Sequence, residues 1–341
     1  MSRHRPARWA AAAGVWVCCG AFLLPQTLPG ATEDLHQFLT GKVGKAAVQM
    51  DLTVGTDWRG SPAHGSYFYA ASTGGRLELK GTNRFEAVSF TEFTDDDPPK
   101  ATGHWQGQLE HGRFTGTWKS PDGRRSLAFD LRSVVSYHAE TASTPRYTAT
   151  LTWPVFTNGA FGRAVTAEVE KTLRADKAEF VDLIKNPEND SFAGKRYSWD
   201  DDWRIEYFAD GFVSLRRYYY EDVGQAGGNH GVARLEGHTF IKTATGARRL
   251  TEKDFLRRPG SWKGVDGLVF KELRRRGAQY VCDGQLKSGD DLDLSQFTLN
   301  RMGITFHFGS YAVAAYPQGT FEAFIPFKDL QDWLRPEFKV P

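Results

Sequence analysis

Residues 103–118 read GHWQGQLEHGRFTGTW, and this stretch decides the architecture that we expect for the first half of the chain. Its large apolar side chains lie among regularly placed glycines: Trp105, Leu109, Phe114 and Trp118 among Gly103, Gly107, Gly112 and Gly116. Short apolar segments bounded by glycine are typical of strands joined by tight turns. Similar segments recur on both sides, and no stretch there has the period of a helix. We therefore predict an all-β module over residues 40–135, an antiparallel meander closed or nearly closed into a barrel.

The pattern changes beyond this module. Residues 136–146 are small or polar with one proline, and we predict a linker there. A strand over 147–153 is followed by apolar residues four apart, which predicts a helix: Phe161, Val165, Val169 and Leu173, continued by Phe180 and Ile184. Further strands, among them one at 311–315, a helix at 265–273 and a short helix at 327–334 complete the pattern. Residues 147–335 are thus expected to form an α+β domain with a mixed or antiparallel sheet and two to three helices.

The first residues indicate export. Arginines at positions 3, 5 and 8 precede an apolar run over residues 9–24, and small residues and prolines follow. This is the layout of a signal peptide, and the run is shorter than the roughly 20 residues that span a bilayer. We predict a signal peptide over residues 1–31, a periplasmic or extracellular mature protein and no transmembrane segment in the mature chain. A retained anchor is one alternative, and lipidation at Cys18 or Cys19 is another, which Trp16 disfavours.

Charge and cysteine content exclude other classes. The chain has 43 Lys and Arg against 41 Asp and Glu, so its net charge of +2 argues against nucleic-acid binding, which needs a basic face. Once residues 1–31 are removed, Cys282 alone remains, and an intrachain disulfide is impossible. We expect Cys282 to be a small buried apolar residue and to be dispensable.

Familiar catalytic signatures are absent from the sequence. There is no nucleophile elbow, no phosphate-binding Gly-Lys-Ser/Thr loop and no His-Glu-x-x-His motif. None of the nine histidines pairs with another at helical spacing, so we expect no metal site and no cofactor. The run of acids at 200–202, between Trp199 and Trp203, is interpreted as an exposed turn.

A glycine-rich segment at 224–231 is the strongest candidate for a binding loop. Its glycines allow positive φ angles and close backbone approach: Gly227, Gly228 and Gly231. Asn229 and His230 at its centre could grip a polar ligand, although a structural hairpin in which His230 caps backbone groups explains the segment as well. Ahead of it, Tyr218 and Tyr220 share one face of a strand, which suits either a recognition surface or cross-strand packing.

Several blocks of the second half resemble a known family. They are FVSLRRYYY at 212–220, GGNHG at 227–231, TGARRLTEKDF at 245–255, and the segment from YAVAAY to IP at 311–326. Their order and spacing resemble the carboxy-terminal domain family of unknown function shared by the lysozyme-sensing anti-sigma factor RsiV and the peptidoglycan deacetylase PdaC. Ala315 departs from the family's usual proline. Residues 40–131 resemble a separate secreted β module.

This resemblance implies binding more than catalysis. In the deacetylase relatives the chemistry belongs to an additional domain with a metal-binding Asp and a His-x-x-x-His motif, which has no counterpart in this sequence. In the anti-sigma relatives a membrane helix precedes the sensor, where here we expect a signal peptide and a β module. We expect a non-catalytic cell-envelope binding or sensing protein whose partner is a peptidoglycan-related glycan or an envelope protein such as lysozyme. The candidate ligand-binding residues are Tyr218, Tyr220, Asn229, His230 and Tyr316. The alternative is a peptidoglycan-directed hydrolase or deacetylase with a site around His230.

Overall fold

The computed structural model describes residues 34–55, 60–71, 75–94, 98–185, 196–222, 231–258 and 262–341. The predicted signal peptide lies outside these ranges and stays a prediction. None of the helices in the described ranges combines the length and the apolar character that crossing a membrane would require.

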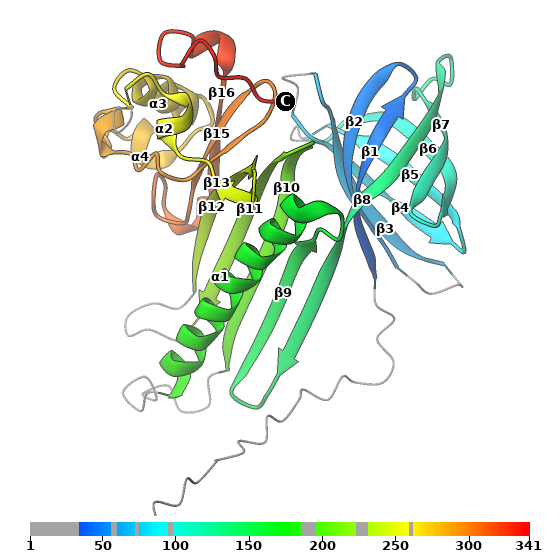
Figure 1. Cartoon of the computed structure of the whole chain (residues 1–341), viewed down its shortest axis with the longest axis horizontal. Coiled ribbons are helices and arrows are strands. Elements are labelled where there is room, and N and C mark those ends of the chain that lie inside the picture. The colour runs from blue at the N-terminus through cyan, green and yellow to red at the C-terminus, as the bar shows by residue number, and fades with distance from the viewer. Residues whose placement is uncertain are drawn as a thin grey trace, which may run out of the picture. The chain divides into compact units, whose positions relative to one another are not determined.

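Eight antiparallel strands form the first part of the chain, and β1 also pairs with β8, which closes the sheet into a barrel (Figure 1). The strands are β1 (Leu35–Val43), β2 (Ala46–Val54), β3 (Ser61–Tyr69), β4 (Leu77–Arg84), β5 (Ala87–Phe93), β6 (Ala101–Glu110), β7 (Arg113–Lys119) and β8 (Ser126–Ser143). Side chains that alternate along each strand fill the interior, among them Tyr67, Trp105 and Phe114. The predicted all-β, barrel-like module is confirmed.

The glycines of residues 103–118 permit close packing inside this barrel. Gly107 of β6 lies opposite Gly116 of β7. A Cβ on Gly116 would come within 2.1 Å of the Gln106 carbonyl oxygen and 2.8 Å of the Phe129 ring. The Phe129 ring can therefore pack directly on the backbone of these two paired strands only because both positions lack a side chain.

The expected linker is instead a strand, which corrects the interpretation of residues 136–146. Strand β8 continues through Ser143, and residues 136–143 pair with β9 (Tyr147–Val155). Val135 and Ala142 of β8 are buried, and the small and polar residues between them are exposed or half-buried. Such a composition also occurs in a strand that has one exposed face. Because residues 136–143 pair with β9, the barrel and the following sheet share a continuous ladder of backbone hydrogen bonds.

This continuity predicts the outcome of limited proteolysis. Because residues 136–143 are hydrogen-bonded into the sheet, a non-specific protease should not cleave there first, whereas the urea-unfolded chain should be cut freely. Fragments can be identified by mass spectrometry. A first cut within residues 136–143 that releases a stable fragment of about 100 residues would contradict the continuous sheet.

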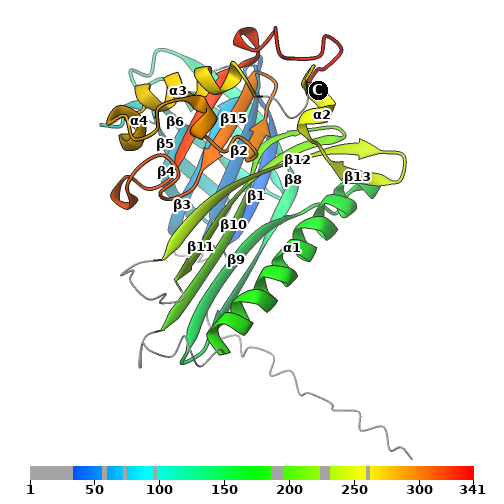
Figure 2. The same cartoon turned by 90° about the vertical axis from the view of Figure 1, so that its left-hand side faces the viewer.

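The second half extends the same sheet and covers one of its faces with a long helix. Strand β9, helix α1 (Gly159–Lys185) and β10 (Tyr197–Ala209) form a parallel crossover, and the antiparallel strands β11 (Phe212–Asp222), β12 (Val232–Thr243) and β13 (Gly246–Arg249) follow. Figure 2 shows α1 lying along this sheet, with β13 near its amino-terminal half. The predicted helix is confirmed, and its buried residues are Gly162, Val165, Val169, Leu173, Phe180 and Ile184.

A smaller layer packs against the other face. It contains helices α2 (Glu252–Phe255), α3 (Val265–Arg275) and α4 (Gln279–Cys282), and a separate sheet of β14 (Phe297–Leu299), β15 (Gly303–Phe308) and β16 (Phe321–Pro326). Buried Ser214 of β11 is hydrogen-bonded to the Leu299 backbone, which fixes this sheet on the larger one. The predicted α+β class is confirmed, and α3 lies where the apolar spacing places a helix.

Three details of this layer differ from the expectations. Residues 311–315 form no strand, because the chain reverses after Gly309 with Tyr311 at a φ of 66°. The expected helix at 327–334 is only a 3-10 turn, η4 (Phe327–Asp329). Cys282 is exposed rather than buried, because it lies at the end of α4, where the helical turn points away from the core.

Candidate binding site

Three of the five candidate residues are close together in the structure. Tyr218 and Tyr220 lie half-buried on the face of β11 that points away from α1, and Tyr316 begins a 3-10 turn, η3 (Tyr316–Gln318). Burial raises the pKa of Tyr218 and of Tyr220, and the neighbouring Tyr316 raises both further. The ring of Tyr311, which is 45% exposed, lies 5.7 Å from that of Tyr316. We call Tyr218, Tyr220, Tyr311 and Tyr316 the tyrosine cluster.

Backbone contacts hold the two sides of this cluster together. The Ser310 amide donates to the Ala233 carbonyl at 2.8 Å, which places the 309–316 segment against the start of β12. The Gly231 amide donates to the Tyr220 hydroxyl at 3.2 Å. Because these bonds come from three elements, the positions of the tyrosine side chains are fixed by the fold rather than by one loop.

The glycine-rich loop is only partly described. Gly227, Gly228, Asn229 and His230 lie outside the described residues, so their predicted roles stay predictions. Gly231 is buried, and a Cβ there would come within 2.3 Å of the Glu221 carbonyl oxygen. Close approach, not a positive φ, therefore explains the glycine at 231.

A polar cleft of about 520 Å³ lies on the same face of the sheet as Tyr218 and Tyr220, although none of the four tyrosines lines it. Asp202 of β10 lines it and lies opposite Tyr218 in the strand register. The other walls come from β2, β3, β4, β11 and β16, and the ionisable lining residues are Asp51, His64, Arg76, Glu78, Lys80, Asp202, Arg204, Glu206, Arg216 and Glu322. The cleft thus lies where the barrel, the large sheet and the small sheet meet.

Arg204 organises one end of the cleft. Its Nε donates to Asp202 at 2.7 Å, and its Nη1 lies 3.4 Å from Asp51. The Asp51 carboxylate is 2.6 Å from His36, whose ring stacks on Tyr137 with centroids 3.6 Å apart. Burial alone would raise the pKa of Asp51, but His36 and Arg204 hold it below its usual range. Asp51 is consequently ionised at neutral pH.

Two further arginines organise the other end. Arg76 lies 3.2 Å from Glu206, and Arg216 lies 3.2 Å from Glu206 and 3.3 Å from Glu322. Despite the opposing effect of burial, His307 and Arg216 lower the pKa of Glu322 to about 2. The cleft is therefore lined by preorganised pairs of opposite charges.

Two buried polar atoms of the cleft make no hydrogen bond within the described residues: Arg216 Nε, which lies 3.2 Å from a Glu206 oxygen, and Asp202 Oδ1. Asp202 Oδ1 is buried and accepts no hydrogen bond from any group in the part of the chain that the structure describes. Its other oxygen, Oδ2, already binds Arg204. An unpaired buried acceptor is costly unless water or a ligand donates to it, so Asp202 marks where a donor group would bind.

The interpretation of residues 200–202 as an exposed turn is wrong. These residues are central to β10, and their side chains alternate between the two faces of the sheet. Asp201 is buried on the side of α1, whereas Asp200 and Asp202 are half-buried beside Tyr220 and Tyr218. The alternating pattern from Trp199 through Trp203 to Ile205 was the signal that could have revealed a strand, but three consecutive acids obscured it.

Comparison with known proteins identifies part of this molecule. Residues 266–328 match a family described as "Protein of unknown function (DUF3298)". This DUF3298 segment supplies Tyr311, Tyr316 and Glu322, whereas β10 and β11 precede it. No curated protein matches the chain.

Two solved DUF3298 structures resemble the chain. A family member from Bacteroides fragilis is 17% identical and covers 59% of this chain and 94% of its own, with a TM-score of 0.41. A DUF3298 family protein from Pseudomonas aeruginosa is 18% identical and covers 61% of this chain and 95% of its own, with a TM-score of 0.42.

Proposed function

We propose that this protein is an exported, non-catalytic cell-envelope protein that binds a peptidoglycan-related glycan in the polar cleft and on the tyrosine cluster. The observation that carries the proposal is the unpaired Asp202 Oδ1 opposite Tyr218 in the strand register, inside a charged cleft. The sequence resemblance to the carboxy-terminal family of RsiV and PdaC, and the signal-peptide pattern, supply the envelope context.

The chemistry of a glycan suits this surface. A pyranose ring has an apolar C–H face that packs on a tyrosine ring, and its hydroxyl groups both donate and accept hydrogen bonds. A hydroxyl can donate to Asp202, and ring oxygens or carboxylates of a muropeptide can accept from Arg204 or Arg216. A volume of about 520 Å³ is in the range of small-ligand sites and would hold a disaccharide-sized group.

The charges of the cleft favour binding over hydrolysis. A glycosidase needs one carboxylic acid whose pKa is raised, so that it can protonate the leaving group. The pKa values of Asp51 and Glu322 are lowered by their basic partners. The alternative, a hydrolase or deacetylase around His230, draws support from Asp200, whose pKa is raised by burial and which lies opposite Tyr220.

Substitution of the tyrosines tests the proposal. We expect Tyr218→Ala and Tyr316→Ala each to weaken binding of soluble muropeptide oligomers by roughly three- to tenfold, because an aromatic contact contributes about 0.5–1.5 kcal/mol. Isothermal titration calorimetry gives the affinities. Phe85→Ala is the matched control, since Phe85 is an exposed aromatic on the turn between β4 and β5 of the barrel.

The same experiment can contradict the proposal. Equal losses in the Phe85 variant, or no binding by the unaltered protein, would remove the glycan assignment. Release of shortened or deacetylated fragments during the titration would show an enzyme instead. Binding of lysozyme that muropeptides do not compete with would point to an envelope protein as the partner.

A further inference from the structure

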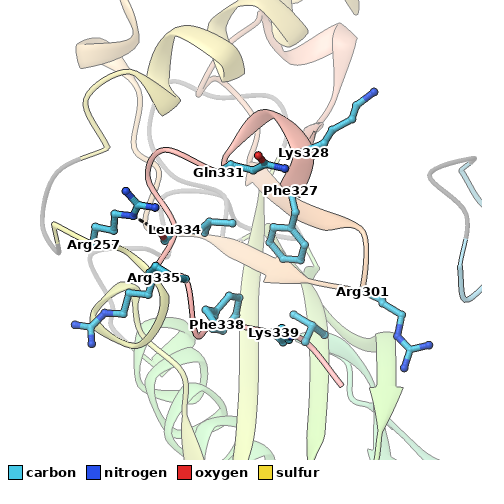
Figure 3. Close-up of a pocket in the computed structure, with 11 residues that line it drawn as sticks. Arg257, Arg301, Phe327, Lys328, Gln331, Leu334, Arg335, Phe338 and Lys339 are labelled. Atoms are coloured by element: carbon cyan, nitrogen blue, oxygen red, sulfur yellow. Dashed lines mark hydrogen bonds between the residues drawn. The ribbon is translucent and has the colours of Figure 1, made fainter.

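A second pocket, which shares no lining residue with the cleft, lies at the carboxy-terminal end of the described chain (Figure 3). Its volume is about 560 Å³. Phe327, Leu334 and Phe338 form its apolar floor, and the rings of Phe327 and Phe338 lie 6.1 Å apart in an edge-on arrangement. All three side chains pack on the core of the small layer, so the floor is a rigid apolar surface.

Basic side chains surround this floor, and none of the lining residues is acidic. The cations are Arg257, Arg301, Lys328, Arg335 and Lys339. Arg335 lies 4.0 Å from Glu337, and Arg301 contacts the Tyr207 hydroxyl. No carboxylate in the described ranges lies within salt-bridge distance of Arg257, Lys328 or Lys339. In a chain with a net charge of only +2, this concentration of positive charge is local.

Two of the arginines are held in a matched arrangement. Leu256 and Leu334 form an isolated antiparallel bridge, and each arginine follows one of these leucines. The Arg257 Nε donates to the Leu334 carbonyl at 2.6 Å, and the Arg335 Nε donates to the Leu256 carbonyl at 3.1 Å. Because Nε anchors each guanidinium to the opposite strand, the backbone restricts the orientation of both arginine side chains.

We propose that this pocket binds an anionic amphiphile, a phosphate monoester or diester attached to a hydrocarbon chain. The chain would pack on Phe327, Leu334 and Phe338, where burial of apolar surface is favourable. The phosphate oxygens would accept bidentate hydrogen bonds from Arg257 and Arg335, with Lys328 and Lys339 adding charge at the rim. A headgroup of up to two negative charges matches several surrounding cations better than a single carboxylate does. This inference does not depend on glycan binding in the cleft.

Binding of octyl phosphate to the full mature protein, measured by calorimetry below the micelle concentration, tests the inference. We expect saturable binding of octyl phosphate. Inorganic phosphate, which lacks the hydrocarbon chain, and octyl glucoside, which lacks the phosphate, should each bind with at least tenfold lower affinity. Equal binding of octyl glucoside would overturn the role of the cations, and equal binding of inorganic phosphate would overturn the role of the floor. Cosedimentation with phosphatidylglycerol vesicles then decides the source: binding indicates a membrane lipid, and its absence with octyl phosphate still bound indicates a free amphiphile.

Charge variants locate the site. Lys328→Gln with Lys339→Gln should weaken octyl phosphate binding at least fivefold without changing the melting temperature, since both side chains are exposed. Arg257→Gln should weaken it about tenfold. The matched control, Lys45→Gln with Lys119→Gln, changes the net charge equally at exposed barrel positions and should bind as the unaltered protein does. Unchanged affinity in both pocket variants, or an equal loss in the barrel control, would refute the assignment.

Discussion

Replacing Glu92 by leucine should destabilise the protein by about 4 kcal/mol or more, because it leaves hydrogen-bond donors inside the barrel without an acceptor. Glu92 of β5 is 2% exposed. Its Oε2 accepts from the Tyr67 hydroxyl at 2.7 Å and from the indole nitrogens of Trp105 and Trp118 at 3.0 and 2.8 Å. Its Oε1 accepts from the Thr102 hydroxyl at 2.7 Å. Burial and the nearby carboxylate raise the pKa of Tyr67, so its hydroxyl stays a donor.

Glu92→Gln is the matched control for this prediction. The amide oxygen can still accept from the ring donors, and the amide nitrogen can donate to the Thr102 hydroxyl, which can also accept. We therefore expect the glutamine variant to lose less than half of what the leucine variant loses. Urea denaturation followed by tryptophan fluorescence gives both values. A leucine variant within about 1 kcal/mol of the unaltered protein would show that these donors find water or other partners.

Local patterns in the sequence were sufficient to predict the barrel. The strands are short, their turns carry glycine, and aromatic residues alternate with glycine along 103–118, so every signal lies within about ten residues. The long helix was equally accessible, since Val165, Val169 and Leu173 repeat at its period. In both cases the information that decides the element is contiguous in the chain.

The continuity of the sheet could not be predicted in the same way. Residues 136–143 carry few large apolar side chains, and composition alone cannot distinguish a loop from a strand with one exposed face. Pairing with β9 across a tight turn, and of Ser136 with Gln37 of β1, decides the outcome. Both pairings form only in the folded protein, so nothing in the local sequence contradicted the linker expected at 136–146.

The candidate site was predictable only in part for a related reason. The alternation of Tyr218 and Tyr220 placed them on one face, and Tyr316 came from the family resemblance. The cleft, however, combines Asp51, Arg76, Arg204 and Glu322, which lie far apart in the sequence and show no motif spacing. Their chemistry arises from charge pairing after folding, which no single-sequence pattern encodes.

A second large effect is expected at Arg217, on the opposite face of the same sheet. Arg217 is 4% exposed, and its guanidinium donates to Asp201 through Nε at 2.9 Å and through Nη2 at 2.5 Å. It also donates to Asp176 of α1, and to Glu236 of β12 at 3.2 Å. Its guanidinium carbon lies 5.2 Å and 4.8 Å from the ring centroids of Trp203 and Tyr219. One guanidinium thus pairs with three carboxylates beneath the helix.

Arg217→Met should therefore cost about 3–5 kcal/mol, measured by urea denaturation at pH 7.5, because Asp201 stays buried without a counter-charge. The loss should depend on pH. Burial already raises the pKa of Asp201 to about 6, and removing Arg217 removes the interactions that lower it. A carboxylate whose folded pKa exceeds its unfolded value of 3.8 loses stability as the pH rises through the folded pKa. The deficit of the variant should consequently shrink between pH 8 and pH 5.

A double variant separates charge from packing in this prediction. Asp201→Asn combined with Arg217→Met removes the buried unpaired charge, so it should recover much of the lost stability and show a flatter pH profile than Arg217→Met alone. If packing of the guanidinium between Trp203 and Tyr219 were the main contribution, the double variant would be as unstable as the single one at every pH. A deficit in Arg217→Met that stays constant from pH 8 to pH 5 would likewise assign the effect to packing, because loss of the Arg217 charge alters the pKa of Asp201 and of the neighbouring His238, and both groups respond to protons in that range.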